Sequence, residues 1–203
     1  MSRRTPFGTR LRAGVRTARA VAWVPAGVAL LILCTNVSVA VAEPAVREPD
    51  GYRLHDYLAP TPGTLTGATT ISAKVAAQMH ADGGAVFIDV MPAAPRPPGR
   101  TVWNSAKRRS LPGSHWLPNV GRGILAPETQ DYFRRHLDRL SSGDSGQALV
   151  FFCRRDCWMS WNAAKRAIEY GFRNVYWFPD GATAWEEQGR PMAQIEPVGE
   201  VPP

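Results

Sequence analysis

The chain has 203 residues, of which 44% are hydrophobic and 20% are charged, and its formal net charge is +7. This length fits one ordinary domain and a shorter extra segment, and the composition excludes the collagen, coiled-coil and low-complexity classes. Six of the 24 basic residues are arginines within residues 1–42, which contain no acid, so 18 basic residues stand against 17 acidic ones in the rest. Such a balance gives no electrostatic reason to expect a nucleic-acid partner.

Residues 1–42 have the three parts of a secretory signal peptide. The arginines open the chain, an apolar run covers residues 20–41, and Ala40-Val41-Ala42 forms a small-x-small cleavage site. We therefore expect export to the periplasm and removal of this segment. The alternative is an uncleaved membrane anchor, because the apolar run is nearly long enough to span a bilayer.

Cleavage leaves two of the three cysteines in the mature protein. Cys34 is removed, and Cys153 and Cys157 remain in an oxidising compartment. There the pair forms either a local disulfide or a reactive thiol pair that cellular reductants maintain.

The rest of the chain divides into an arm, a domain and a tail. Residues 43–67 are rich in Pro, Gly and Thr, and we expect an extended N-terminal arm that either packs across the domain or acts as a tether. The domain covers residues 68–192, and residues 193–203 form a C-terminal tail.

Strands and helices alternate along the domain. The expected strands cover residues 69–71, 85–90, 115–118, 148–152 and 174–177, and the expected helices cover residues 73–81, 127–140, 158–170 and 182–188. Ser72 is the N-cap of the first helix, and Pro127 opens the second. Two of the strands are continuous apolar runs, typical of strands buried on both faces of a parallel sheet. We therefore predict a three-layer α/β/α fold around a central parallel sheet of about five strands.

Cys153 directly follows the fourth of these strands. Ligands of open parallel sheets bind beyond the carboxyl ends of the strands, so the loop 153–158 is the candidate site. Its backbone N–H groups and the following helix N-terminus favour an anion or a thiolate, and we expect them to lower the pKa of Cys153. Arg154 and Arg155 either strengthen this effect or are only solvated charges.

Several segments resemble, in order, the successive landmarks of a rhodanese domain. They are Val86-Phe87-Ile88-Asp89-Val90, Leu111-Pro112-Gly113-Ser114, Leu149-Val150-Phe151-Phe152-Cys153-Arg154, Ala163-Ala164, Gly171-Phe172-Arg173-Asn174-Val175, and Asp180-Gly181-Ala182-Thr183-Ala184-Trp185 with Gly189 and Pro191. The resemblance covers residues 68–192 and implies the rhodanese-like fold. It places the rhodanese nucleophile on Cys153, which would carry sulfane sulfur as a persulfide.

Within that superfamily, residues 156–166 resemble a narrower group, the CXXCW motif proteins associated with pyrroloquinoline quinone (PQQ) dependent catabolism. Trp103 and residues 176–181 are also similar to that group. Here the cysteines are spaced CxxxCW, one residue wider than the group's name. The resemblance implies that the protein acts alongside periplasmic PQQ alcohol dehydrogenases and their cytochromes. It does not imply that this chain binds PQQ.

The loop departs from ordinary sulfurtransferase loops. Its end is bulky and apolar at Trp158, Met159 and Trp161, and it is about one residue longer than usual. Rhodanese-related phosphatases have a longer loop closed by an Arg that clamps phosphate, but Met159 or Ser160 stands at that place. Phosphatase activity is therefore not expected.

Cys157 is a further departure. It is either a resolving thiol that attacks a Cys153 persulfide or sulfenate, or half of a structural disulfide.

The remaining candidates are weaker. Asp156 belongs to the loop, Asp89 either orients it or caps a turn, and Ser160 and Asn162 cap or pack the helix start.

The other aromatic and ligating side chains give no clear site. Five tryptophans either line a mouth over Cys153 or belong to the core: Trp103, Trp116, Trp158, Trp161 and Trp177. The histidines and the CxxxC pair have no metal-site spacing, so we expect no metal, and no nucleotide-binding motif predicts a cofactor.

Two functions follow from these features. The first is a periplasmic rhodanese-like thiol protein that transfers sulfur through Cys153, or exchanges thiols with Cys157, with a small thiol or sulfane-sulfur partner. The second is a non-catalytic module that docks on a periplasmic dehydrogenase or cytochrome through its Trp-rich loop and its arm.

Overall fold

The computed structural model describes residues 45–93 and 107–202. The predictions for the signal segment, Cys34 and Trp103 lie outside these residues. Five strands form one parallel sheet in the order β1-β6-β5-β2-β4. Their bounds are β1 Thr69–Thr70, β2 Ala85–Asp89, β4 His115–Trp116, β5 Ala148–Phe152 and β6 Val175–Phe178. The predicted α/β fold with a central parallel sheet is confirmed.

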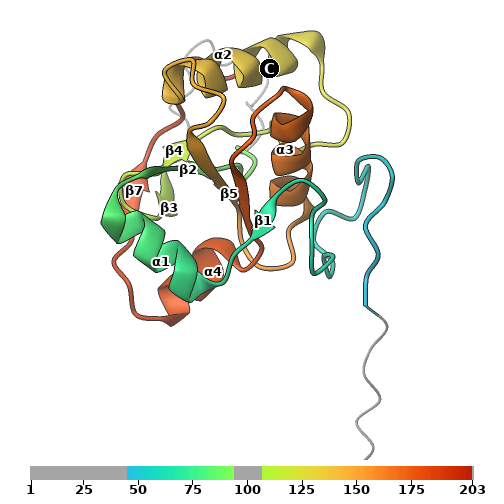
Figure 1. The fold of residues 1–203 in the computed structure, drawn as a ribbon. Helices are drawn as coiled ribbons and strands as arrows, with labels where there is room; N and C mark the ends of the chain where they lie inside the picture. Colours follow the sequence, from blue (N-terminus) through green and yellow to red (C-terminus); the bar gives the residue numbers. More distant parts are fainter. Residues whose placement is uncertain (1–44, 94–106, 203) are drawn as a thin grey trace, which may run out of the picture. The chain divides into compact units, whose positions relative to one another are not determined.

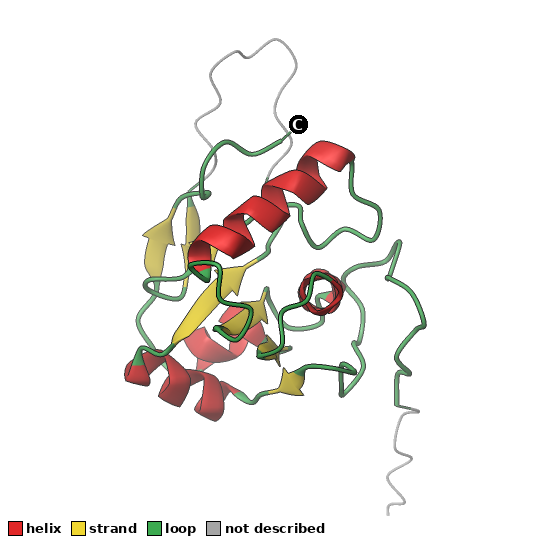
Figure 2. Ribbon diagram, turned by 45° about the horizontal axis from the view of Figure 1, so that its top comes forward, coloured by secondary structure: helices red, strands yellow, loops and turns green. Residues whose placement is uncertain are grey.

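Four helices cover the two faces of the sheet (Figure 1). They are α1 Ala73–Asp82, α2 Pro127–Leu140, α3 Trp158–Glu169 and α4 Gly181–Glu187. Side chains of α2 and α3 share one hydrophobic cluster with the sheet, and side chains of α1 and α4 share a second cluster on the opposite face. Figure 2 shows the strands between these two pairs of helices.

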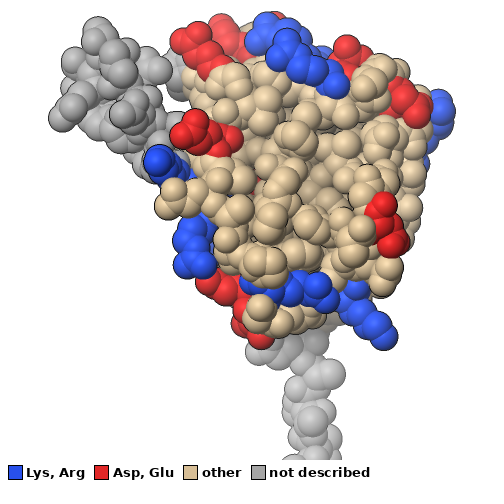
Figure 3. Space-filling model, turned by 90° about the vertical axis from the view of Figure 1, so that its left-hand side faces the viewer, with Lys and Arg blue, Asp and Glu red and all other residues tan. Residues whose placement is uncertain are grey.

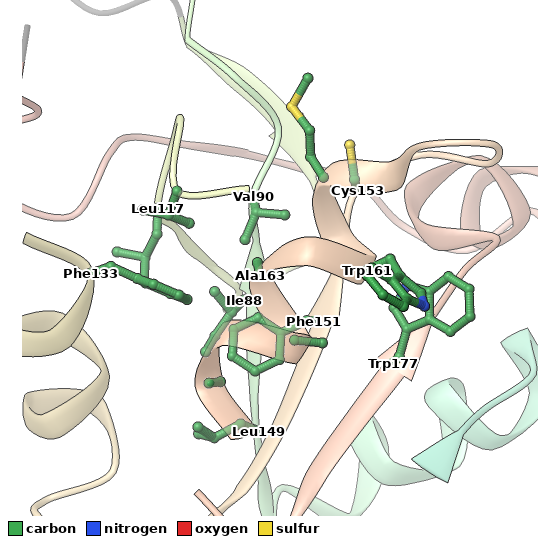
Figure 4. Close-up of a cluster of buried hydrophobic side chains, with 14 of the residues drawn as sticks. Ile88, Val90, Leu117, Phe133, Leu149, Phe151, Cys153, Trp161, Ala163 and Trp177 are labelled. Carbon is green, nitrogen blue, oxygen red and sulfur yellow. The ribbon is translucent and has the colours of Figure 1, made fainter. Parts of the chain in front are cut away.

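The alternation of β5 explains why its sequence is apolar throughout. Leu149 and Phe151 point into the α2 and α3 cluster, whereas Val150 and Phe152 point into the α1 and α4 cluster. All four side chains are fully buried, because successive residues of a strand face opposite sides of the sheet. Figure 4 shows part of the first cluster, from Leu149 at one end of β5 to Cys153 beyond its other end.

Local sequence signals set the helix ends. Ser72 caps α1, with Val75 N–H donating to the Ser72 Oγ at 3.4 Å, and α1 ends at Gly83 with a left-handed φ of 72°. Pro127 occupies the first turn of α2, as predicted.

A second, two-stranded sheet is not predicted by the sequence. In it β3 (Arg108–Ser110) pairs antiparallel with β7 (Ala193–Ile195). Residues 193–203 were expected to be a tail, yet β7 adds a strand, and beyond it Val198 N–H donates to Trp116 O and Tyr132 Oη donates to Val198 O. Three-residue strands carry too little hydrophobic alternation to be read from sequence.

The N-terminal arm packs on the domain, which decides the alternative left open above. Leu65 is buried in the first core cluster. The indole Nε1 of Trp158 donates to Pro60 O, and that of Trp161 donates to Thr64 O, both at 3.1 Å. The arm is thus part of the folded unit from about residue 52 onward.

The described residues form no membrane-spanning helix. The face drawn in Figure 3 has no stripe of charges of one sign. Among residues 45–93 and 107–202, no helix is long and apolar enough to cross a bilayer. On the drawn face, basic and acidic side chains surround an uncharged centre (Figure 3).

Candidate functional site

The site lies where three strands of the sheet end in register. Asp89 at the end of β2 is the partner of Phe152 at the end of β5, and Phe152 is the partner of Phe178 at the end of β6. Cys153 is the next residue along β5. The strand register therefore places Cys153 beside Asp89 at the carboxyl edge of the parallel sheet, as predicted.

The loop after Cys153 is tied to the start of α4. Ala182 N–H donates to Cys153 O at 2.9 Å, and Arg154 forms an antiparallel bridge with Gly181. Gly181 has a φ of 49°, and a Cβ there would lie 2.5 Å from Cys153 O. Only glycine allows this close approach, and the contact fixes the path of the first loop residues.

The two arginines of the loop are exposed, and one of them pairs with acidic side chains. Arg155 makes ion pairs with Asp180 and Glu187 on the α4 side, and its N–H donates to Thr183 Oγ1. Arg154 is exposed. The structure thus favours the interpretation of both as surface charges, with Arg155 also anchoring the loop to α4.

The N-terminal arm pairs with the second half of the loop. Ala59 N–H donates to Asp156 O at 3.0 Å, and Trp158 N–H donates to Tyr57 O at 2.9 Å. Between these two bonds, Leu58 lies opposite Cys157 in an antiparallel bridge. The arm therefore covers the part of the loop that leads into α3.

Both cysteines are free thiols and both are buried. Cys153 has 0% of its surface exposed and Cys157 has 1%. The Cys153 Sγ lies 3.3 Å from Met91 Sδ, so the residue that follows β2 by two positions closes over this sulfur. A reagent reaches the pair only when Met91 or the arm moves.

The two thiols differ in their acidity. Hydrogen bonds from the Cys153 thiol, and then from backbone N–H groups of Met159, Arg154 and Ser160, lower the pKa of Cys157 to about 7 against the opposing effect of burial. Met159 and Ser160 belong to the first turn of α3, where the helix dipole also favours a negative charge.

Cys153 behaves in the opposite way, which corrects the sequence-based expectation. Burial raises its pKa well above the ordinary value, and the sulfur of Cys157 and the carboxylate of Asp89 raise it further. The lowered pKa was expected on Cys153 because the loop amides were assumed to surround the first cysteine. The amides instead face Cys157, at the N-terminus of α3.

Asp89 is buried and fully engaged. Its carboxylate accepts from Arg108 Nε, from Ser110 Oγ and from the backbone N–H of Met91, the last at 2.9 Å. Burial raises the pKa of Asp89, and Arg108 opposes that rise. The side chain both caps the turn after β2 and holds Arg108 near Cys153.

The remaining loop residues have structural partners. Ser160 Oγ donates to Cys157 O at 3.0 Å and accepts from Trp177 Nε1. Met159 packs against Gly121, where a Cβ would lie 2.3 Å from Met159 O. Asn162 bonds to both backbone groups of Arg53, so it holds the arm.

All four described candidate tryptophans are buried, which confirms the core interpretation for Trp116, Trp158, Trp161 and Trp177.

Sequence reasoning missed Met91, Arg108 and the arm segment 57–59 as parts of the site. Met91 had a weak signal, because it follows the carboxyl end of a predicted buried strand. Arg108 and the arm reach the site through contacts between distant segments, which local patterns do not encode. Within the described residues, no cluster of three or more His, Cys, Asp or Glu side chains is suited to a metal ion.

Comparison with known families now places the chain. The sequence pattern of the rhodanese-like domain matches residues 72–188. The chain belongs to the rhodanese-like domain family. The match covers β2, β5, the cysteine loop, α3 and α4, so the candidate site lies wholly inside this rhodanese-like domain apart from the arm.

Solved structures with a similar fold include three bacterial proteins. The polysulfide-sulfur transferase homodimer of Wolinella succinogenes is 20% identical, with 63% of this chain and 79% of that chain covered and a TM-score of 0.41. A rhodanese-like domain from Anabaena is 19% identical, with 64% and 86% covered and a TM-score of 0.41. A thiosulfate sulfurtransferase of Pseudomonas aeruginosa is 17% identical, with 64% of this chain but 21% of that chain covered and a TM-score of 0.44. No curated protein sequence matches the chain.

Within this rhodanese-like domain, the two cysteines have different surroundings. The second cysteine is the N-cap residue of α3. The first cysteine is enclosed between Met91 and Asp89. Chemically, the site is a buried dithiol in which one sulfur is poised as a thiolate near neutral pH.

Proposed function

We propose that this rhodanese-like protein is exported to the periplasm and acts through thiol chemistry at Cys153 and Cys157. In this chemistry a cysteine thiolate attacks the outer sulfur of a sulfane-sulfur donor. The rest of the donor leaves as a thiolate, or as sulfite when the donor is thiosulfate. The cysteine persulfide then gives its outer sulfur to an acceptor thiolate, or the second cysteine attacks its inner sulfur, so that the Cys153–Cys157 disulfide forms and HS⁻ leaves. The observation that carries the proposal is the pair of free, buried thiols in one loop beyond the carboxyl end of β5, where Cys153 follows the strand directly and Cys157 begins α3.

The partners of this chemistry are a small thiol and a sulfane-sulfur donor. The CXXCW resemblance of residues 156–166 supports a setting in PQQ-dependent alcohol catabolism, beside a periplasmic dehydrogenase or a cytochrome. The basic, apolar and small-residue parts of residues 1–42 support export. The signal cleavage itself is tested by the mass of the mature chain, which is expected to begin at Glu43.

Intact mass spectrometry of the mature protein tests the chemistry. The protein is reduced, freed of reductant and incubated with thiosulfate or polysulfide. A gain of one sulfur that cyanide removes, or a loss of two protons that dithiothreitol reverses, supports the proposal. The double variant Cys153→Ser/Cys157→Ser is the matched control and is expected to show neither change. An unmodified wild-type mass under all these conditions would overturn the proposal.

A second candidate function has its own supporting observation. Both sulfurs are buried, whereas Leu54, Leu58 and Ile124 are exposed apolar side chains on the arm and a neighbouring loop, with Leu58 at 57% and Ile124 at 78%. Leu54 lies against this loop at Gly123. These features suit a non-catalytic module that docks on a periplasmic dehydrogenase or cytochrome. Binding of such a partner by the double cysteine variant, and its loss in Leu58→Asp, would favour this function.

A further inference from the structure

The backbone holds Met91 beside Cys153. The residue after Asp89 still donates its N–H to the last residue of β5, at 3.0 Å, so the pairing of β2 with β5 continues and brings Met91 alongside Cys153. The N–H of Met91 donates to Asp89 Oδ1 at 2.9 Å, and the carbonyl of Met91 accepts from Trp116 Nε1 at 2.6 Å. Asp89 and Trp116 are both buried, so the backbone of Met91 is fixed on both sides.

The thioether of Met91 is in contact with the thiol of Cys153. The Cys153 Sγ donates its proton to Met91 Sδ, and the two sulfurs are 3.3 Å apart. Met91 is half-buried, whereas Cys153 has 0% of its surface exposed and Cys157 has 1%. A small oxidant that arrives from solvent therefore meets the thioether before it meets either thiol. An aliphatic side chain would cover Cys153 as well, but it would place no oxidisable sulfur there.

Two other methionines have a similar exposure and lie in different surroundings. Met79 and Met192 are also half-buried, and they pack on the α1 and α4 cluster. Cys153 and Cys157 belong to the α2 and α3 cluster, on the opposite face of the sheet. The chain thus contains one methionine in contact with the dithiol and two matched methionines that are remote from it.

We propose that the dithiol repairs Met91: when an oxidant converts the thioether to a sulfoxide, Cys153 reduces the sulfoxide in place and Cys157 completes the reaction. The protein then acts as a methionine sulfoxide reductase toward its own side chain. This activity goes beyond sulfur transfer, and it requires only the free thiol pair and the contact of Cys153 with Met91.

The steps balance with an oxidant and an external thiol. A peroxide gives one oxygen atom to Met91 Sδ, and hydrogen peroxide leaves as water. Cys153 Sγ attacks the sulfoxide, its proton passes to the oxygen, and the S–O bond of Met91 breaks as an S–O bond to Cys153 forms. The products are the Met91 thioether and a Cys153 sulfenic acid. Cys157–SH then attacks Cys153 Sγ, the Cys153–Cys157 disulfide forms, and water leaves. Two molecules of a small thiol reduce this disulfide and become a disulfide themselves.

Sulfoxide mapping of the mature protein tests the repair. Methyl methanethiosulfonate first protects the thiols as disulfides, hydrogen peroxide oxidises the methionines, and catalase removes the peroxide. Dithiothreitol then frees the thiols, and fragmentation mass spectrometry follows the sulfoxide at each methionine. We expect Met91 to lose roughly half or more of its sulfoxide, and Met79 and Met192 to lose less than about a tenth. Half is the lower bound because a sulfoxide sulfur is chiral, and a thiol fixed on one side of it reduces one epimer.

Two outcomes in the wild type would overturn the inference. The first is a sulfoxide at Met91 that persists as fully as those at Met79 and Met192. The second is a Met91 that stays unoxidised while Met79 and Met192 carry sulfoxide. These measurements follow oxygen on a methionine and not sulfur on a cysteine. A wild type that forms a persulfide but leaves its Met91 sulfoxide intact would therefore refute the repair and leave the proposed sulfur transfer standing.

Single variants assign the two thiol roles in the repair. Cys153→Ser removes the attacking sulfur with little change of volume, and its Met91 sulfoxide is expected to persist in dithiothreitol. Cys157→Ser is expected to reduce Met91 but to leave the sulfenic acid on Cys153 without an internal partner. Excess dimedone should then label Cys153 about fivefold more in Cys157→Ser than in wild type. Equal loss of the Met91 sulfoxide in Cys153→Ser and wild type would refute the repair.

Discussion

At the scale of single residues, the difference between the two cysteines comes from the backbone and charges around each sulfur. Cys157 begins a helix, and Cys153 ends a strand. The unpaired N–H groups of a helix start stabilise a thiolate, whereas Cys153 at the end of β5 lies against Met91 and near the carboxylate of Asp89, both from the end of the neighbouring β2. Two identical side chains four positions apart therefore have opposite pKa shifts.

The first residue-scale prediction concerns pH. Because Cys157 has a pKa of about 7, the alkylation rate of the reduced protein should rise with pH, inflect near 7 and level off above it. Below the inflection the thiol is protonated, and the rate should fall about tenfold per pH unit. Cys157→Ser should abolish this inflection. An inflection in the wild type at the ordinary cysteine value of about 8.5 would contradict the prediction.

The second residue-scale prediction concerns Asp89. Asp89→Asn leaves the guanidinium of Arg108 without its counter-charge, so we expect the free energy of unfolding to fall by about 3 kcal/mol. Urea unfolding at pH 7 measures this loss. Asp56→Asn is the control, because the Asp56 side chain is 73% exposed and its ion pairs should contribute less than about 1 kcal/mol. Equal losses for the two variants would show that the buried carboxylate is not a stabilising partner.

At the scale of elements, the arm acts as an extra segment paired with the loop. Its bonds to Asp156 and Trp158, and the indole bonds of α3 to Pro60 and Thr64, hold it over the entrance to the dithiol. A short pairing of this kind opens more easily than the core of the sheet, since few backbone bonds must break. The arm is therefore, together with Met91, a part of the described structure whose movement would open access to the sulfurs.

Ala59→Pro tests this role of the arm. Proline removes the N–H that donates to Asp156 O, and one backbone hydrogen bond contributes about 1 kcal/mol, so we expect the dithiol to alkylate roughly five- to tenfold faster. The rate is followed with iodoacetamide under native conditions. Ala59→Ser keeps the N–H and should match wild type. If the proline variant is no faster than the serine variant, access does not pass through the arm.

At the scale of the whole molecule, segments outside the rhodanese-like match complete the structure. The match ends at residue 188, but β7 pairs with β3, and Val198 bonds to Trp116 and Tyr132. On the N-terminal side, the arm contributes Leu65 to the core. The stable unit is therefore longer than the domain of residues 68–192 that the sequence suggests.

The stabilities of two chain lengths, compared with each other, test whether the arm is part of the stable unit. A chain of residues 68–203 loses the burial of Leu65, worth about 2 kcal/mol, and the carbonyl partners of Trp158 and Trp161, worth about 1 kcal/mol each. We expect its free energy of unfolding to be roughly 4 kcal/mol below that of residues 45–203. Urea unfolding of both chains measures the difference. Equal free energies of unfolding would mean that the arm covers the cysteine loop without stabilising the fold.

The sequence by itself determined the sheet, its helices and the place of the cysteine loop. Continuous apolar runs such as residues 148–152 require burial on both faces, and a parallel sheet with helices on each side supplies it, so Cys153 and Asp89 had to share one edge. These features follow from local periodicity, which is set by residues a few positions apart.

Only the tertiary structure decided the contact of Met91 with Cys153, the ion pair of Arg108 with Asp89, and the docking of the arm and the tail. Each depends on contacts between segments far apart in the chain, such as Leu58 with Cys157 or Arg108 with Asp89. Three-residue strands and Pro-rich segments carry no period that reveals such partners.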